Sequence, residues 1–234
     1  MTAKNLAKDL EKLKDPKRNV QESRFFKTGK GEYGEGDIFW GVSVPEVRKL
    51  ARKYFHLSFS ELQDLLNSKV HCLRQTALII LNNRYQKSND KEKKFIADFY
   101  LKNTKNINNW DLVDISAPNI LGEWLLGKSK KILYKLAKSK NLWERRIAIL
   151  ATYGFIRKNQ FKETLKIAEI LLRDEHDLIH KAVGWMLREV GKKDLQTEKK
   201  FLNKHCQKMP RVMLRYAIEK FTAQERERYL THKG

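Results

Sequence analysis

Apolar residues recur along this chain with the period of an α-helix. From about Leu57 onward they occupy positions i, i+3, i+4 and i+7 of short segments that are separated by a few polar residues. No stretch shows the strict alternation of apolar and polar residues that a half-buried strand requires. The pattern therefore predicts an all-α protein made of short amphipathic helices.

Four of the helical segments resemble one another. They are HCLRQTALIILNNRY at 71–85, LWERRIAILATYGF at 142–155, LIHKAVGWMLREVG at 178–191 and MLRYAIEKF at 213–221. Their equivalent polar positions, which are 71, 35 and 34 residues apart, are Gln75, Arg146, Lys181 and Arg215. The first gap has room for one further member, centred near Val113 within residues 106–125.

A period near 35 with two helices per unit is typical of HEAT-like solenoids, in which each helix pair buries its apolar face by stacking on its neighbours. We therefore expect residues 1–234 to form a single domain, an α-solenoid made of a superhelical stack of HEAT-like repeats. The recurring polar position comes just before small or apolar core residues, so we expect it on the concave face of the stack.

The segment KTGKGEYGEGD at 27–37 interrupts the helical pattern, because it has four glycines within eight residues. We expect a loop there, followed by a helix that opens at Val44 with Pro45 in its first turn. The glycines match the dinucleotide fingerprint G-x-G-x-x-G, but no strand is expected before them, so a nucleotide cofactor is disfavoured. Lys27 and Lys30 leave two interpretations open, a phosphate-contacting loop and a plain surface turn.

The chain is strongly basic. Lys and Arg number 49 against 28 Asp and Glu, a net charge of +21 that is spread along the whole length. Such a surface attracts polyanions, since lysines and arginines that meet phosphates release condensed counterions. The N-terminal MTAKNLAKDL has neither a signal core nor a lipidation motif, and the longest apolar run, near 77–81, is far short of the roughly 20 residues of a membrane span. We therefore expect a cytoplasmic protein that binds nucleic acid, most of all duplex DNA, rather than a membrane.

Neither the cysteines nor the histidines indicate a metal site. Cys72 and Cys206 lie far apart without a C-x-x-C pair, and we expect both to be buried thiols. His176 and His180 have the spacing of a zinc motif, but no third ligand is evident, so we favour two unrelated histidines near a helix start.

Tryptophans, arginines and one carboxylate recur in register on three adjacent repeats. Trp110 and Asp114 are four residues apart and share one face of a helix that begins near Asn109, whereas Asp111 is turned away from them. The following repeats have tryptophan and arginine with a spacing of three, as Trp143 with Arg146 and Trp185 with Arg188. Any one of these could be a core residue or a solvated charge. Together they favour a functional cleft, in which a carboxylate amid positive charge needs a chemical reason.

These stretches resemble the DNA alkylation repair family, the AlkD-like DNA glycosylases. The matching segments are GVSVPEVRKLARKY at 41–54, WDLVDISAPNILGEWL at 110–125, LWERRIAIL at 142–150 and IHKAVGWMLRE at 179–189. The resemblance implies a superhelix of HEAT-like repeats that removes N3- or N7-alkylated purines by hydrolysis. It also implies a monofunctional glycosylase without metal or nucleotide cofactor, and we expect a monomer.

By motif, the resemblance makes Asp114 the catalytic aspartate, with Trp110 and Trp185 beside it. It makes Arg146 and Arg188 contacts to DNA. Further candidate DNA contacts, taken from the basic positions and the matching segments, are Lys181, Arg215, Lys27, Lys30 and Ser43. Ser43 stands where some members of the family carry a larger amide, which leaves the preferred lesion open.

The expected chemistry suits these residue types. An alkylated purine carries a formal positive charge and is its own leaving group, so little acid catalysis is needed. A fixed carboxylate such as Asp114 then stabilises the oxocarbenium-like sugar or orients water, and tryptophan faces stabilise nearby cations by roughly 0.5 to 2 kcal/mol. Two other functions stay open: a non-catalytic protein that binds damaged or branched DNA, and an adaptor that binds peptides on a concave face.

Overall fold

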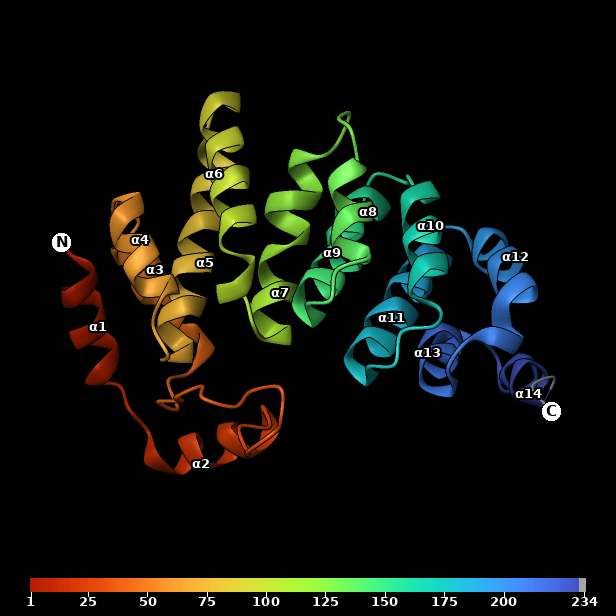
Figure 1. Cartoon of the computed structure of the whole chain (residues 1–234), viewed down its shortest axis with the longest axis horizontal. Coiled ribbons are helices and arrows are strands. Elements are labelled where there is room, and N and C mark those ends of the chain that lie inside the picture. Colours follow the sequence, from red (N-terminus) through yellow and green to blue (C-terminus); the bar gives the residue numbers. More distant parts are fainter. Residues whose placement is uncertain (232–234) are drawn as a thin grey trace. The chain divides into compact units, whose positions relative to one another are not determined.

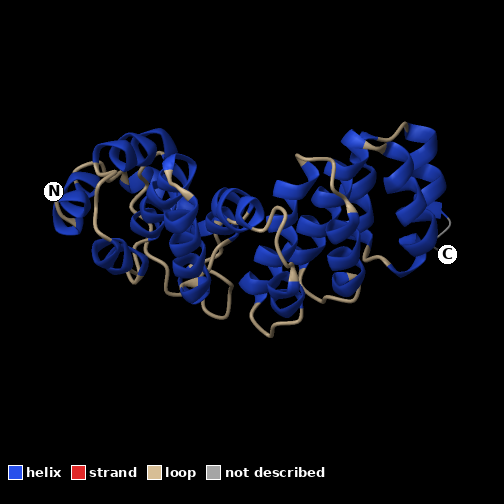
Figure 2. Ribbon diagram, turned by 90° about the horizontal axis from the view of Figure 1, so that it is seen from above, coloured by secondary structure: helices blue, strands red, loops and turns tan. Residues whose placement is uncertain are grey.

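A computed structural model describes residues 1–231, which form fourteen α-helices and contain no strand (Figure 2). Ile38 and Val70 make an isolated β-bridge. The chain divides into two compact units, Met1–Ser116 and Ala117–Gly234. The prediction of an all-α repeat fold is confirmed, whereas the single domain stays a prediction. No helix of residues 1–231 is both long enough and apolar enough to cross a membrane.

The first unit is built around its longest helix, α5. The helices of this unit are α1 (Ala3–Glu11), α2 (Pro16–Phe25), α3 (Val44–Lys53), α4 (Phe59–Leu66), α5 (His71–Lys87), α6 (Asp90–Lys102) and α7 (Trp110–Ser116). Helix α5 packs against α1, α3, α4, α6 and α7, and buries Leu78, Ile80 and Leu81 completely. Helix α2 runs crosswise past the ends of α5 and α7 (Figure 1), so that its C-terminal end reaches the start of α7.

The second unit has two layers of helices. After a short π-helical segment at Pro118–Gly122, its helices are α8 (Lys131–Ala137), α9 (Leu142–Ile156), α10 (Lys162–Leu171), α11 (Asp177–Lys193), α12 (Leu195–His205), α13 (Arg211–Ala217) and α14 (Ala223–Thr231). Helices α9, α11 and α13 follow one another in one layer, which we call the inner layer. Helices α8, α10 and α12 pack on them as the outer layer. Each pair of one outer and one inner helix is therefore one repeat, as the period near 35 predicts.

Three repeats begin with the same hydrogen-bonded loop. In each loop, one side-chain oxygen accepts a hydrogen bond from the backbone N–H of the residue two positions later. The accepting residues are Ser68, Ser139 and Asp174, with distances of 3.0, 3.0 and 2.9 Å. The backbone carbonyl of the same residue accepts a hydrogen bond from a side chain six residues later; these side chains are Arg74, Arg145 and His180. The loops are 71 and 35 residues apart, so the register that the sequence predicted is confirmed.

The recurring polar position that includes Gln75 and Arg146 comes one residue after these side chains. We expected it on the concave face of the stack, but the structure gives it a different role. Gln75 and Arg146 are buried, at 7% and 5% exposure. Gln75 donates to the Asp111 carboxylate on α7, and Arg146 donates to the Leu178 carbonyl on α11. Each side chain thus ties its own helix to the next one, because a buried polar group needs an internal partner. Lys181 is half-buried and Arg215 is exposed.

The glycine-rich segment forms the expected loop, and α3 begins at Val44 with Pro45 in its first turn, as predicted. Asp37 at the end of the loop makes a buried ion pair with Arg74 on α5, with 2.7 Å between Oδ2 and Nη2. Within the loop, Gly34 N donates to the Lys27 carbonyl at 3.0 Å. A Cβ at Gly34 would overlap the carbonyl oxygens of Phe26 and Lys27.

We expect Gly34→Ala to destabilise the protein by about 1–3 kcal/mol, because the new methyl group would push the loop away from the end of α2. The free energy of unfolding in urea measures the effect. Gly29→Ala is the matched control, since a Cβ there meets only the flexible Glu32 side chain. Equal stability of the two variants would contradict the packing described for the loop.

Candidate active site

The start of α7 holds the two residues that the sequence placed together. Asn109 is fully buried, and its Oδ1 accepts a hydrogen bond from the Trp110 backbone N–H at 2.8 Å, which satisfies one of the free N–H groups of the first turn. Trp110 and Asp114 are both half-buried and lie one helical turn apart. Leu112 and Val113 are fully buried on the other side of the helix. The helix that the spacing of four requires is therefore present, while the role of Trp110 and Asp114 as a functional pair stays a prediction.

Trp110 is held by a stack of aromatic rings. The Phe26 ring lies parallel to the indole, with 5.2 Å between centroids and 19° between planes. Phe39 stacks on Phe26 with 4.8 Å between centroids, and His71 stacks on Phe39 at 4.6 Å and lies tilted against Phe26 at 5.2 Å. Phe25 meets the indole edge-on at 5.6 Å. Offset-stacked and edge-to-face pairs are favourable geometries, so these rings fix the plane of Trp110.

We expect Phe26→Leu to lower the free energy of unfolding by about 1–3 kcal/mol, because it removes two stacked pairs worth roughly 0.5–1.5 kcal/mol each while keeping an apolar side chain. Phe161→Leu is the matched control, since the half-buried Phe161 stacks on no ring within residues 1–231. Urea unfolding of both variants distinguishes the stack from simple loss of a phenyl group. An equal loss in the two would contradict a special role of the stack.

The other carboxylate of α7, Asp111, is bound on both oxygens. His71 Nε2 lies 2.9 Å from Oδ1, and Gln75 Nε2 donates to Oδ2 at 3.0 Å. Asp111 therefore holds α7 against α5 and at the same time orients the imidazole at the end of the aromatic stack. Both partners lie on α5. The two aspartates of α7 thus have separate roles, one structural and one in the candidate site.

A buried phenol lies within the electrostatic range of Asp114. Tyr100 on α6 is fully buried, and its hydroxyl pairs with Ser116 Oγ at 3.0 Å. Burial raises the pKa of Tyr100 well above its usual value, the hydrogen bond with Ser116 lowers it, and the negative charge of Asp114 raises it further. Tyr100 therefore stays a neutral phenol next to the negative charge of Asp114.

Trp185, which the sequence predicted as a site residue, lies in the second unit. Trp185 on α11 is half-buried, and its Nε1 donates to Glu189 Oε1 at 3.0 Å. Arg188, one turn away, donates through Nη1 to Glu219 and has its Nε 3.9 Å from Glu189. Lys192 also donates to Glu189, at 2.6 Å. The indole and the guanidinium are thus both oriented by carboxylates of the same unit.

The remaining candidate residues differ in how accessible they are. Trp143 is 8% exposed and packs in the core, so it does not line a cleft. Lys181 pairs with Asp177 at 2.6 Å, and Ser43 caps α3 by accepting a hydrogen bond from the Glu46 N–H at 3.4 Å. The side chains that are exposed are Lys27, Lys30 and Arg215. Contact of any of these residues with DNA stays a prediction.

The histidine pair has structural contacts. His176 Nδ1 accepts a hydrogen bond from the Leu178 N–H at 3.1 Å and so caps α11, while His180 Nε2 lies 2.5 Å from the Asp174 carbonyl. Within residues 1–231, no three His, Cys, Asp or Glu side chains are grouped so as to hold a metal ion. Cys72 and Cys206 are buried free thiols, as predicted.

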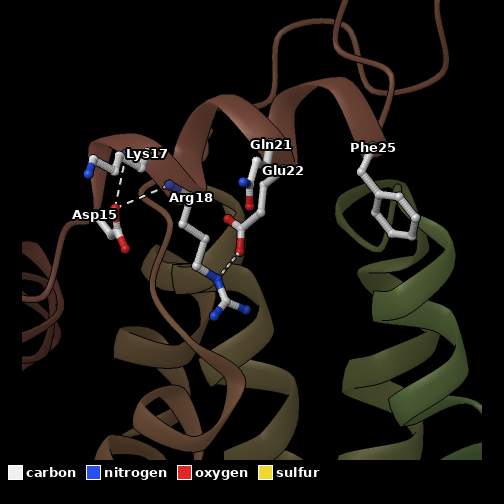
Figure 3. A pocket seen from close by; sticks show the side chains of 6 residues that line it. All are labelled: Asp15, Lys17, Arg18, Gln21, Glu22 and Phe25. Atoms are coloured by element: carbon white, nitrogen blue, oxygen red, sulfur yellow. Dashed lines mark hydrogen bonds and ion pairs between the residues drawn. The ribbon is translucent and has the colours of Figure 1, made fainter.

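A groove of about 670 Å³ runs along α2 next to the aromatic stack (Figure 3). Its lining residues are Asp15, Lys17, Arg18, Gln21, Glu22 and Phe25. Asp15 caps α2 by accepting hydrogen bonds from the backbone N–H groups of Lys17 and Arg18, at 2.9 and 3.2 Å. The Arg18 side chain pairs with Glu22 at 2.9 Å. Charges in the groove are therefore largely balanced, and its link to the candidate site is Phe25, which reaches Trp110.

The family model of the DNA alkylation repair enzymes matches residues 6–221. The chain belongs to the DNA alkylation repair enzyme family. Among curated proteins none matches the chain significantly. Two solved structures are similar to this family member in fold. The "Predicted DNA alkylation repair enzyme from Enterococcus faecalis" has a TM-score of 0.70 at 18% identity and covers 90% of this chain and 97% of its own. AlkD2 from Streptococcus mutans has a TM-score of 0.54 at 20% identity, with 94% and 97% covered.

For this member of the alkylation repair family, the sequence did not predict which residues pack on Trp110 and hold its ring in place. Phe26, Phe39 and His71 are far from Trp110 in the chain, and their contacts depend on how α2 and the glycine-rich loop fold back on α5. One signal was present: the Phe25–Phe26 pair directly precedes the loop, in a helix whose other residues are mostly polar. Two adjacent aromatic residues at the end of a polar helix indicate a packing contact at that end.

Proposed function

We propose that this protein is a monofunctional DNA glycosylase. It hydrolyses the N-glycosidic bond of cationic N3- or N7-alkylated purines in duplex DNA and so starts base excision repair of alkylation damage. The observation that carries the proposal is the pairing on α7 of a half-buried carboxylate, Asp114, with an indole, Trp110, whose plane is fixed by stacked rings. Family membership supports a role in DNA alkylation repair. The cytoplasmic location and the monomeric state stay predictions.

In this proposal Asp114 stabilises the sugar. Cleavage of the bond to a cationic base leaves a neutral purine and a positively charged, oxocarbenium-like deoxyribose, so negative charge is needed next to C1′. A carboxylate in a half-buried position is less screened than one in water, and it is already in place when the charge develops. The same carboxylate can orient the water molecule that attacks C1′. The products are the free purine and an abasic site.

The role we propose for Trp110 is to face the lesion nucleotide. An indole attracts a cationic ring or sugar through its π face, by roughly 0.5–2 kcal/mol depending on desolvation. A neutral base gains less, so the same contact favours alkylated purines over normal ones. Because Phe26 and Phe25 fix the ring, little ordering is required when DNA binds.

We propose that Trp185 also contacts the lesion nucleotide and that Arg188 and Arg146 contribute to phosphate binding. The hydrogen bond to Glu189 supports this role for Trp185, because it orients an indole that remains half-buried. Arg188 would exchange its partner Glu219 for a phosphate, since both are charge-assisted contacts. Arg146 is deeply buried, so its part is to place α11 through the Leu178 carbonyl.

Charge selectivity provides the test of this mechanism. The protein is incubated with duplexes that carry one 7-methylguanine, one neutral etheno-adenine or no lesion, and abasic sites are counted by strand cleavage in alkali. We expect abasic sites from the 7-methylguanine duplex alone. Equal cleavage at the neutral lesion would contradict a mechanism based on cationic charge. Binding of the methylated duplex without abasic sites would instead support a non-catalytic protein that binds damaged DNA.

A further inference from the structure

The outer layer of the second unit carries positive charge that no carboxylate balances. Between Trp124 and Trp143 the chain has six lysines and no Asp, Glu or Arg; the lysines are Lys128, Lys130, Lys131, Lys135, Lys138 and Lys140. All are exposed except Lys130, which is half-buried. Among the described residues none of these ammonium groups pairs with a carboxylate; two of them lie over aromatic rings instead. We call this set the α8 lysines.

Three of the α8 lysines form one continuous face. Lys131, Lys135 and Lys138 have the spacing i, i+4 and i+7, which places them on the same side of the helix. The opposite side is apolar and packs in the unit, with Leu133 and Leu136 buried. At a rise of about 1.5 Å per residue the charged face extends over roughly 10 Å. Duplex DNA carries one negative charge per ~1.7 Å of its axis, so several phosphates can meet this face.

The stability of α8 does not explain these lysines. The helix begins with Lys130 and Lys131, it has no side-chain cap, and its first turn has no acidic residue. Positive charge at a helix N-terminus is unfavourable, because it opposes the helix dipole. Helices α4 and α9 begin with favourable choices, Ser58 with Glu61 and Asn141, whereas α8 shares with α5 and α13 a start that has neither cap nor carboxylate. The lysines at the start of α8 do not stabilise the helix, so their exposed and unpaired charge is available for binding.

Helix α11 of the inner layer differs in its charge. On α11, Lys181 pairs with Asp177 and Lys192 with Glu189, while Arg188 has two carboxylates within reach. These cations must give up a partner before they bind a phosphate. The α8 lysines need not, so they supply the stronger electrostatic attraction.

We propose that the exposed face of α8 is a second DNA-binding surface, in the outer layer of the unit, which contacts the phosphate backbone of duplex DNA without regard to sequence. Lysines act as point charges toward phosphate, and contacts to phosphate carry no base readout. No large apolar side chain of residues 124–143 is exposed, so this surface lacks the groups that insert into a membrane or stack on single-stranded bases.

The test uses the full-length protein and an unmodified 20-base-pair duplex, so its outcome does not depend on base release. Lys131, Lys135 and Lys138 are all changed to Gln, and the affinity is measured by fluorescence anisotropy between 50 and 200 mM NaCl. Each lost phosphate contact lowers the slope of log K against log salt by about 0.9. We expect the slope to fall by about 2–3 and the affinity at low salt to fall by about 10-fold or more.

The matched control changes Lys4 and Lys8 on α1 and Lys12 at its C-terminal end to Gln, which removes the same net charge from another set of exposed lysines. We expect a smaller change of slope in this control. Equal changes in the two triple variants would overturn the proposal, because net charge alone would then account for both. Binding is also measured to vesicles with 30% phosphatidylserine. Loss of vesicle binding with unchanged duplex binding would overturn it in favour of a membrane surface.

Discussion

Replacing Asp114 by asparagine is expected to lower base release by about 100-fold or more while leaving DNA binding unchanged or slightly tighter. A negative charge about 4 Å from the cationic sugar stabilises the transition state by on the order of 4 kcal/mol, at the effective dielectric constant near 20 of a half-buried site. This energy corresponds to a rate increase of up to about 10³. Asparagine keeps the size of the side chain and removes only the charge. Binding is not weakened, because a carboxylate repels the phosphates that the rest of the surface attracts.

Single-turnover release of methylated purine, with enzyme in excess, measures this effect free of product release. Asp98→Asn is the matched control: this aspartate on α6 is also accessible, with a side chain that is 48% exposed, and it pairs with Lys94. We expect wild-type rates from the control. Rates within a few-fold of wild type for Asp114→Asn would show that the carboxylate does not stabilise the sugar.

Glu198→Gln is expected to stabilise the protein at alkaline pH, on the order of 3 kcal/mol at pH 8.5. Glu198 on α12 is 2% exposed, its Oε1 has no hydrogen-bond partner among the described residues, and it packs against Gly191, where a Cβ would overlap the carboxylate. Burial raises the pKa of Glu198 to about 8, although the charge of Arg188 lowers it in part. The unfolded chain ionises near its usual value of 4.5, so stability declines as the pH rises from about 4.5 to about 8. Glutamine cannot ionise and removes this decline.

Glu225→Gln is the matched control for this second prediction, because we expect it to change the stability at alkaline pH in the opposite direction. Hydrogen bonds from Lys199 and Thr222 lower the pKa of Glu225, so the ionised carboxylate stabilises the fold above its unfolded pKa and this contribution is lost as the pH falls. Glu225→Gln is therefore less stable than wild type at pH 8.5. Thermal unfolding of the three proteins between pH 5 and 9 measures both signs. A pH profile of Glu198→Gln that parallels wild type would show that the Glu198 carboxyl does not cause the decline.

The sequence predicted the helices and their repeat register because both depend on local periodicity. Apolar spacing identified the helices around residues 71–85, 142–155 and 178–191, and the aligned positions coincide with loops that share the same hydrogen bonds at Ser68, Ser139 and Asp174. The pairing of Trp110 with Asp114 followed from a spacing of four on one helix. These features need no knowledge of distant contacts.

Features that depend on distant contacts were missed or placed differently. The rings that hold Trp110 come from α2, the segment after the glycine-rich loop and α5, and no local pattern brings Phe26 or Phe39 to it. Gln75 and Arg146 were expected on a concave face, but they are buried and bind partners on neighbouring helices. Sequence periodicity shows that a position recurs, but not whether its side chain faces solvent or the next repeat.

Composition likewise gave the net charge without its distribution. The excess of positive charge was evident from the sequence, but only the structure separates cations paired with carboxylates, such as Lys181, from the unpaired lysines of α8. This distinction bears on DNA binding, because a paired cation must first lose its partner.

The most direct test of the central claim is mass-spectrometric detection of the free base. Wild-type protein is incubated with methylated duplex DNA, and the released 3-methyladenine and 7-methylguanine are quantified together with the abasic sites that remain. The proposed function predicts free methylated purine and abasic sites in equal amounts, with neither formed from unmethylated DNA. Duplex binding with no free purine would contradict the claim that this protein is a glycosylase.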